Sequence, residues 1–310
     1  MKIKIVSFAA AAILLLSSCS ALFGNFRDDL DTQNSIYSSD LSRTTETSSP
    51  EDVASLTKEI SYSEGVAEEL EENTVSITIP EGYTLARIAM LLEEKGLCTV
   101  DEFIDEAQSG KYHKIYSLLL EQELNNSRCF ALEGYLFPDT YEFYKNASLE
   151  DIINSFLANT ERKITEDLRT QISVSAYTVD QIITMASIIE KESQGEEIMP
   201  IISSIFHNRL DSGMKLQSDV TIKYVEGAVK PFISGDINRY NEHYNTYKCD
   251  RLPAGAICNP GIKAILAALN PARTDYFFFV TDKETQEYYF ASTYEEHLQN
   301  VDLAGWAKSD

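Results

Sequence analysis

The sequence predicts an α+β protein, in which several helices are combined with a small antiparallel sheet. Residues 178–192 carry apolar side chains at helical spacing, which is typical of an amphipathic helix. Further along, residues 276–280 and 287–291 form two aromatic-rich runs on either side of an Asp-Lys-Glu turn, a pattern that predicts a β-hairpin. The length of 310 residues allows one large domain or two modest ones.

Residues 1–24 have the pattern of an export signal. Lys2 and Lys4 precede the apolar stretch Ile5–Leu16, and two serines then lead into Cys19. This resembles a bacterial lipoprotein signal, in which Cys19 becomes the lipidated N-terminus. The alternative is an uncleaved transmembrane anchor over residues 5–24, because about 20 apolar or small residues just cross a bilayer. Both interpretations predict an exported, membrane-attached protein.

Residues 25–73 are rich in Asp, Glu, Ser and Thr. Such a segment offers too little apolar surface to fold alone, so we expect a largely disordered acidic tether. The whole chain has a formal net charge of -23. A nucleic-acid partner is therefore excluded, because phosphate binding needs a basic surface.

Residues 74–126 are expected to form a small module. Val75, Ile77 and Ile79 alternate with polar residues, which predicts a half-buried strand. Thr84 can cap a first helix, and either Thr99 or Asp101 can cap a second. A strand followed by two short helices resembles a LysM-like module, which often holds glycan. A packing subdomain without a ligand is an equally good interpretation.

Residues 127–310 are expected to form a larger mixed domain of helices and a small antiparallel sheet. Gly134–Tyr144 is dense in aromatic residues and has a central proline, which favours a structured loop or an edge strand. Apolar periodicity and capping signals predict the helices of this domain. They cover Leu149–Arg169, Thr178–Glu192, Met199–Leu210 and Ile262–Leu269.

Four cysteines follow Cys19 in the sequence. An exported protein with an even number of cysteines can form disulfides, and Cys249 and Cys258 are close enough in sequence to bridge across a loop. Buried free thiols, which include Cys98 and Cys129, are the alternative. The chain has no CxxC pair and no histidine at metal spacing, so we expect neither a metal site nor a cofactor.

Two glutamates near the end of the 178–192 helix are candidates for acid catalysis. Glu190 follows Ile188 and Ile189, and burial beside apolar neighbours raises the pKa of a carboxyl group and favours its acid form. At about 100° per residue, Glu190 and Glu192 lie on opposite flanks of the apolar stripe. Periodicity leaves the choice between them open. Alternatively, both are solvated surface carboxylates.

Two polar clusters downstream suit a sugar ligand. They consist of Gln217, Ser218, Asp219 and Thr221, and of Tyr244, Asn245 and Tyr247. Sugars bind through stacking on aromatic rings and through hydrogen bonds to amides, hydroxyls and carboxyls, so these residues are candidates for a glycan cleft. The alternative for each cluster is an ordinary turn network.

Five blocks of the sequence, in order, are similar to the endolytic murein transglycosylases, the YceG-like family. They read EGYLFPDTYEF, ASIIEKES, IFHNRLDSGMKLQSDVTIKY, YNTYKCDRLPAGAICNPG and ALNPARTDYFFFV. The resemblance extends from about Thr74 to the C-terminus. Five ordered blocks are far more specific than a single short motif. The resemblance implies that residues 127–310 are the catalytic domain.

The resemblance implies lytic cleavage of peptidoglycan between N-acetylmuramic acid and N-acetylglucosamine, with a 1,6-anhydro end and shorter nascent strands. It assigns the acid to Glu190. No second carboxylate is required, because the muramyl 6-hydroxyl supplies the attacking oxygen. It also favours glycan contacts over turn networks for four residues of the two polar clusters. The lone His207 within IFHNRL is interpreted as structural. The residues with the strongest implied contacts are Gln217, Asp219, Tyr244 and Asn245, and weaker candidates for the cleft wall are Glu133 and Tyr135.

Three features depart from the family pattern. Cys19 replaces the usual transmembrane helix, an acidic tether takes much of the N-terminal region, and Arg251–Gly255 stands where the family has a glycine and paired prolines. A non-catalytic, membrane-tethered glycan-binding lipoprotein is the alternative function, and a hydrolase using Asp219 as second carboxylate is a third. The expected partners are peptidoglycan strands, the membrane and peptidoglycan synthases, on the extracytoplasmic side.

Overall fold

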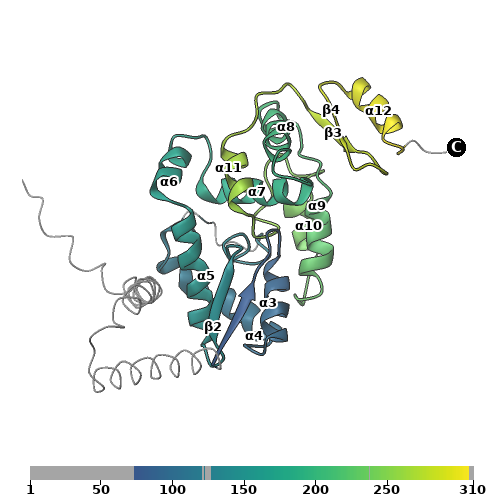
Figure 1. The fold of residues 1–310 in the computed structure, drawn as a ribbon. Coiled ribbons are helices and arrows are strands. Elements are labelled where there is room, and N and C mark those ends of the chain that lie inside the picture. Colours follow the sequence, from purple (N-terminus) through teal and green to yellow (C-terminus); the bar gives the residue numbers. More distant parts are fainter. Residues whose placement is uncertain (1–72, 121, 123–126, 237, 307–310) are drawn as a thin grey trace, which may run out of the picture. The chain divides into compact units, whose positions relative to one another are not determined.

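The computed structural model describes residues 73–120, 122, 127–236 and 238–306. Asn73–Asp310 forms one compact unit (Figure 1). Cys19, the predicted signal and nearly all of the predicted tether lie outside the described residues. Within the described part of the chain, no helix is both long and apolar enough to cross a membrane.

The first described elements are strand β1 (Thr74–Thr78), helix α3 (Leu85–Glu94) and helix α4 (Val100–Ala107). This order confirms the predicted strand and two helices, and Thr99 is the cap of α4. The partner of β1 is β2 (Thr140–Tyr144), which pairs with it antiparallel. The small sheet therefore crosses the boundary predicted at residue 126, and the structure does not establish a LysM module.

A layer of helices follows β2. It consists of α5 (Leu149–Lys163), α6 (Glu166–Ser173), α7 (Val179–Glu192), α8 (Met199–Asp211) and α11 (Ile262–Leu269). The single helix predicted over Leu149–Arg169 is two helices, because the side chain of Thr165 accepts a hydrogen bond from the Leu168 N–H and starts a new helix. Helix α7 lies against α8 and α11 near the middle of the unit (Figure 1). Its residues Ile182–Ile189 are all buried.

Several shorter elements connect these helices. They are the 3₁₀ turns Lys111–Lys114 and Ser117–Leu119, helix α9 (Val220–Tyr224), the π-helical turn Val225–Val229 and helix α10 (Arg239–Tyr244). Helix α9 contacts α7 and α10. Ser218, which precedes α9, contacts Glu192 at the C-terminal end of α7.

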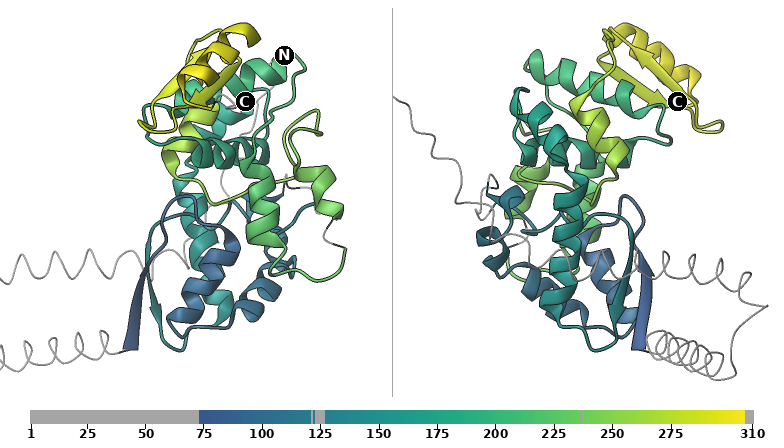
Figure 2. Two further views of the ribbon diagram at one scale, coloured as in Figure 1. Left: turned by 90° about the vertical axis from the view of Figure 1, so that its right-hand side faces the viewer. Right: turned by 60° about the vertical axis from the view of Figure 1, so that its left-hand side comes forward.

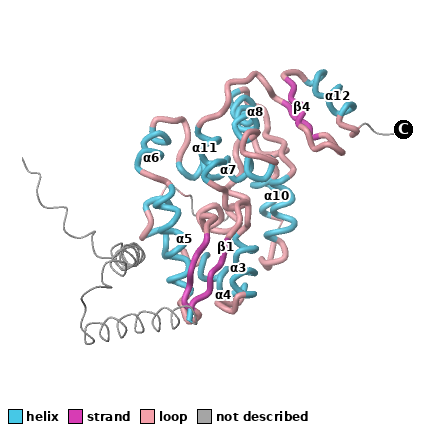
Figure 3. Tube along the Cα trace, viewed as in Figure 1, coloured by secondary structure: helices cyan, strands magenta, loops and turns pink. Residues whose placement is uncertain are grey.

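The last elements form a hairpin and a helix. Strands β3 (Phe278–Thr281) and β4 (Tyr288–Ala291) pair antiparallel, as predicted, and α12 (Tyr294–Leu303) packs on them. This group and the β1–β2 sheet lie at opposite ends of the unit (Figures 2 and 3). The Tyr288 hydroxyl donates a 2.7 Å hydrogen bond to the Glu192 carbonyl, which fastens the hairpin to the end of α7.

Cys249 and Cys258, which the sequence left open as a disulfide or as free thiols, do not form a bridge. All four described cysteines are free, and Cys129 and Cys258 are buried. The two thiols have different partners: Cys258 contacts the Ser187 carbonyl, and Cys249 contacts the Glu242 carbonyl. Of the two alternatives left open by the sequence, free thiols are the one that the structure shows, because proximity in sequence does not bring the two sulfur atoms together.

Candidate active site

The two candidate carboxyl groups at the end of α7 face different neighbours. Glu192 Oε1 accepts a hydrogen bond of 2.5 Å from the Ser218 hydroxyl. Glu190 Oε2 accepts a hydrogen bond of 3.1 Å from the backbone N–H of Gly261. One side of the helix end therefore meets the segment before α9, and the other side meets the turn before α11.

Glu192 is electrostatically suited to hold a proton. Burial raises the pKa of its carboxyl group, and the nearby Asp219 carboxylate raises it further. The Ser218 hydrogen bond and the charges of Lys223 and Arg209 act in the opposite direction. This carboxyl group can therefore stay protonated at a pH above the usual pKa of a glutamate. The Ser218 hydroxyl beside it can stabilise the anion once the proton has left.

The segment that faces Glu192 is fixed by a small hydroxyl network. The Ser218 N–H donates to Thr246 Oγ1 at 3.0 Å, and the hydroxyls of Thr246 and Thr221 both donate to the Ser218 carbonyl at 2.9 Å. Ser218, Thr221 and Thr246 are all buried. Two of the predicted ligands, Ser218 and Thr221, therefore hold the segment. Thr246, which lies within YNTY and was not among the predicted ligands, also holds the segment.

Gln217 has a strained backbone and an exposed side chain. Its φ of 49° lies in the left-handed region, where residues other than glycine are uncommon. Its N–H donates to the Thr246 carbonyl at 3.1 Å, which helps to hold this conformation. Such strain persists only where the surroundings impose it, and it concentrates at functional sites.

Three more predicted ligands lie on this side of the molecule. Asp219 is exposed and pairs with Lys223 at 2.6 Å. Asn245 is half-buried and accepts the Tyr247 N–H through Oδ1 at 3.0 Å. Tyr247 is exposed, and burial together with Asp219 and Glu192 raises the pKa of its hydroxyl. Asp219 and Tyr247 are therefore close enough to Glu192 to interact with its carboxyl group electrostatically. Gln217 and Asn245 are the chain neighbours of Ser218 and Thr246, which are hydrogen-bonded to each other beside Glu192.

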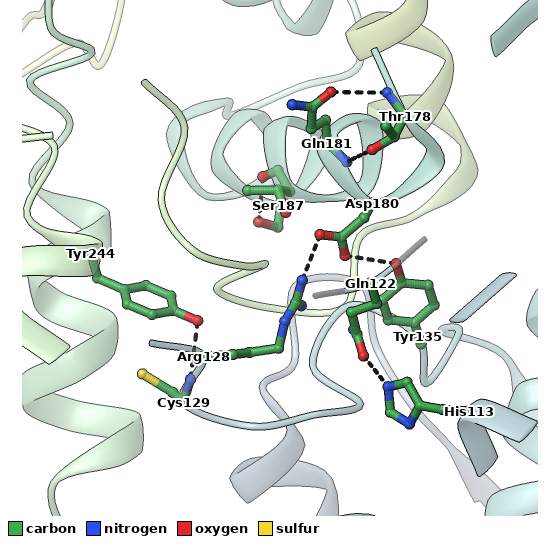
Figure 4. A network of polar contacts seen from close by, with 11 residues as sticks. His113, Gln122, Arg128, Cys129, Tyr135, Thr178, Asp180, Gln181, Ser187 and Tyr244 are labelled. Atoms are coloured by element: carbon green, nitrogen blue, oxygen red, sulfur yellow. Dashed lines mark hydrogen bonds and ion pairs between the residues drawn. The ribbon is translucent and has the colours of Figure 1, made fainter. Parts of the chain in front are cut away.

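Three other predicted ligands lie in the core. Tyr244, Glu133 and Tyr135 are each at most 1% exposed, so their side chains form no open cleft wall. The Tyr244 hydroxyl accepts the Cys129 N–H, and the Tyr135 hydroxyl donates to Asp180 (Figure 4). Aromatic composition alone does not distinguish a ring in a cleft from a ring in the core, and the expectation for these residues is corrected accordingly.

Arg209 supports the site and was missed by the sequence analysis. Its Nε donates to the Phe277 carbonyl at 2.6 Å, and its Nη1 donates to the Leu216 carbonyl. It therefore joins the segment before Gln217 to the C-terminal hairpin, and its charge lowers the pKa of Glu192. His207 in the same block contacts the Ala268 carbonyl at 2.9 Å, which agrees with a structural role.

Glu190 belongs to a second group of residues. Burial raises the pKa of its carboxyl group, the Gly261 N–H lowers it, and the Glu81 carboxylate raises it. A Cβ at Gly261 would lie 1.8 Å from Glu81 Oε1, so a larger residue there would require the exposed Glu81 side chain to move. The Lys191 ammonium contacts the Gly82 carbonyl at 3.4 Å. No hydrogen bond described for Glu190 reaches the 216–221 segment.

The described residues offer no evident metal site. Across residues 73–120, 122, 127–236 and 238–306, no three His, Cys, Asp or Glu side chains are grouped so that they could hold a metal ion.

A desolvated carboxyl group held against a strained polar segment, in an α+β domain, has the environment that a general acid requires. The chain belongs to the YceG-like family, whose model matches residues 45–303. A crystal structure of a yceG-like protein from Listeria monocytogenes aligns with a TM-score of 0.63 and 33% identity, covering 73% of this chain and 75% of that one.

Two curated relatives are similar over most of the chain. The endolytic murein transglycosylase of Streptococcus pneumoniae serotype 2 strain D39 is 32% identical over 253 residues, which are 76% of this chain and 46% of the relative. That of Bacillus subtilis strain 168 is 34% identical over 227 residues, which are 71% of this chain and 62% of the relative. The matched part thus spans about half to three-fifths of the length of these relatives.

Proposed function

We propose that the chain is an endolytic murein transglycosylase that cleaves peptidoglycan between N-acetylmuramic acid and N-acetylglucosamine. The observation that carries the proposal is the half-buried Glu192 carboxyl, which accepts the Ser218 hydroxyl and lies close to Asp219 and Tyr247, beside the segment that contains Gln217. Family membership and the names of the relatives support the same activity. Exposed amide, carboxyl and aromatic groups beside an acid are what a glycan chain requires.

The proposed reaction has two proton transfers through one carboxyl group. Glu192 first donates its proton to the glycosidic oxygen, the bond from that oxygen to muramyl C1 breaks, and positive charge develops on the sugar ring. The Glu192 carboxylate then takes the proton of the muramyl 6-hydroxyl while O6 bonds to C1. The products are a free 4-hydroxyl and a 1,6-anhydro end, and no water is consumed.

We assign the acid to Glu192, although the sequence resemblance favoured Glu190. Glu192 is the carboxyl whose side chain contacts the segment that carries the exposed polar residues. Glu190 instead accepts a backbone N–H in the turn before α11. A general acid must reach the oxygen that it protonates, so contact with the ligand-bearing side favours Glu192.

The product ends separate this reaction from hydrolysis and from simple binding. Purified peptidoglycan would be incubated with the protein, and the released fragments would be measured by mass spectrometry. Anhydro ends on internal fragments support the proposal. Reducing ends would mean that water attacks, with Asp219 as the second carboxylate, and glycan binding without fragments would mean a non-catalytic lipoprotein.

We further propose an extracytoplasmic, membrane-attached enzyme that limits the length of nascent strands beside the peptidoglycan synthases. The apolar Ile5–Leu16 segment and the serines before Cys19 support export and lipidation. Several acyl chains on one cysteine give stable attachment, whereas a single chain binds a membrane only marginally. Attachment would hold the site close to the membrane, where new glycan emerges.

A further inference from the structure

Glu133 is a buried carboxyl group that the proposed reaction does not use. It is 1% exposed, and its two oxygens accept three hydrogen bonds. Oε1 accepts the Leu85 N–H at 2.8 Å and the Asn259 side-chain amide at 3.2 Å. Oε2 accepts the Tyr224 hydroxyl at 3.0 Å. These donors come from three separate segments of the chain.

The Oε1 contacts lead to the Glu190 side of the site. Asn259 is fully buried, and its side-chain amide also donates to the Tyr83 carbonyl at 2.9 Å. Its backbone carbonyl accepts the Gly82 N–H at 2.9 Å. Two residues further along, the Gly261 N–H binds Glu190. Glu133 and Asn259 together therefore fix the first wall, which we define as residues 80–83 and 259–261.

The Oε2 contact leads to the Glu192 side. Tyr224 is the last residue of α9, and its ring packs on Tyr244 with centroids 5.6 Å apart. Helix α9 begins directly after Asp219, next to the residue that contacts Glu192. The Tyr224 hydroxyl is therefore the link from Glu133 to the second wall, which we define as residues 217–224.

We infer that Glu133 is a positioning residue, whose carboxyl group holds the two walls of the site at a fixed separation. The inference rests on the proposed function, because it concerns how a glycan strand spanning both walls is held against Glu192. A buried group with three hydrogen bonds has one preferred geometry. Glu133 therefore fixes the positions of its three donors and takes no direct part in the reaction. Misplacement of about 1 Å away from the chemistry can cost about 10²-fold in rate.

Tyr224→Phe is the most selective test. It removes the bond to the second wall and keeps the ring, the Leu85 contact and the Asn259 contact. Tyr141→Phe is the matched control, since it deletes another buried hydroxyl, which donates to the Phe137 carbonyl and contacts Asn159. We expect kcat/KM to fall about tenfold in Tyr224→Phe, and to change less than twofold in Tyr141→Phe at a comparable fall in Tm.

Variants of Glu133 complete the test. Gln keeps an acceptor for Leu85 and Asn259 and can bond to Tyr224 through its amide, so Glu133→Gln should retain activity within a few-fold of the parent. Glu133→Ala should lose at least as much activity as Tyr224→Phe. Adding Tyr224→Phe to Glu133→Ala should cause no further loss, because both changes remove one link. Equal effects of Tyr224→Phe and Tyr141→Phe, or additive effects in the double variant, would overturn the inference.

Amide hydrogen exchange separates this inference from the proposed function. We expect Tyr224→Phe to speed exchange in residues 217–224, and Glu133→Ala to speed it in both walls. A parent protein that releases no anhydro ends would refute the proposed function. The exchange rates of the two variants would still show whether Glu133 connects the two walls. An active parent with unchanged exchange in both variants would refute the link alone.

Discussion

The Ser218 hydroxyl lies 2.5 Å from Glu192 Oε1 and donates a hydrogen bond to it. This contact connects the last turn of α7, which comes from the core, to a segment that Thr246, Thr221 and Arg209 also hold. Burial favours a protonated Glu192 and the Ser218 bond favours its anion. A group that first donates and then accepts a proton must be stable in both its acid and its anionic form, and burial and the Ser218 hydrogen bond stabilise one form each.

The first prediction distinguishes the two glutamates. Glu192→Gln keeps the size of the side chain and removes the transferable proton, so we expect a loss of at least about 10²–10⁴-fold in kcat. Glu190→Gln is the matched variant two residues away and should lose less than about tenfold. Both would be measured as anhydro ends released per minute, with Tm as a check on folding. Greater sensitivity at Glu190 would restore the assignment implied by the sequence resemblance.

The second prediction concerns pH. Ser218→Ala removes a hydrogen bond that lowers the pKa of Glu192, so that pKa rises. The donor must be protonated, and activity is lost as pH increases through its pKa. The alkaline limb of the pH–kcat profile should therefore move to higher pH, with a lower maximum because the anion is less stable.

Ser203→Ala is the control for this pH shift. Ser203 is buried, and its hydroxyl has no hydrogen-bond partner among the described residues. The same chemical change at Ser203 should leave the alkaline limb where it is. A shift of the limb to lower pH in Ser218→Ala would contradict the role given to the contact.

The third prediction uses the strained backbone of Gln217. A left-handed conformation costs an L-residue about 1–2 kcal/mol, whereas glycine adopts it freely but loses about 0.5–1 kcal/mol through chain entropy. Gln217→Gly should therefore leave stability unchanged or raise it by about 1 kcal/mol, yet lower kcat/KM by removing an amide from the site. Chemical denaturation and kinetics on the same samples measure both quantities.

Gln286 provides the comparison. Its φ is 63°, and it lies in the β3–β4 turn. Gln286→Gly makes the same backbone change outside the site and should leave kcat/KM within about twofold of the parent. If both glycine variants lose activity equally, the Gln217 side chain has no special part in binding.

The helices of this fold could be predicted because their signals are local. Thr84, Thr99 and Thr178 each accept a backbone N–H at the start of a helix, and all three caps are visible in the sequence. The pairing of β1 with β2 could not be predicted in this way, because the partner strand follows two helices and about 60 residues of chain.

The candidate site, like the fold, could be predicted from the sequence only in part. Its polar residues were identified from composition and resemblance, but their burial depends on distant segments. Tyr244 and Tyr247 belong to one motif, and only Tyr247 is exposed. The choice between Glu190 and Glu192 depends on contacts with Gly261 and Ser218, which are 71 and 26 residues away along the chain. Periodicity carries no information on such neighbours.

The fourth prediction tests the anchor. Cleavage before Cys19 would remove residues 1–18 and leave acyl chains on that cysteine. Cys19→Ala should block processing, so that a longer precursor accumulates. Intact-mass measurement of detergent-extracted protein checks both forms. An unmodified parent chain that still begins at Met1 would support a transmembrane anchor instead.

The last prediction concerns stability and Glu133. Burial raises the pKa of its carboxyl group from 4.5 to about 8, although Leu85, Tyr224, Arg128 and Lys191 all act to lower it. Between these two pH values the folded chain keeps a proton that the unfolded chain releases. The free energy of unfolding should therefore fall as pH rises through this window, by at most about 1.4 kcal/mol per pH unit from this group.

Glu133→Gln isolates this contribution, because it removes the titrating group and keeps the shape. Glu190 and Glu192 also have raised pKa values and contribute with the same sign, so the difference between parent and variant is the quantity to measure. Urea unfolding at intervals from pH 4.5 to 8 should show a steeper decline in the parent than in Glu133→Gln. Parallel curves would mean that the carboxyl is ionised in the folded protein throughout, held as an anion by its three donors.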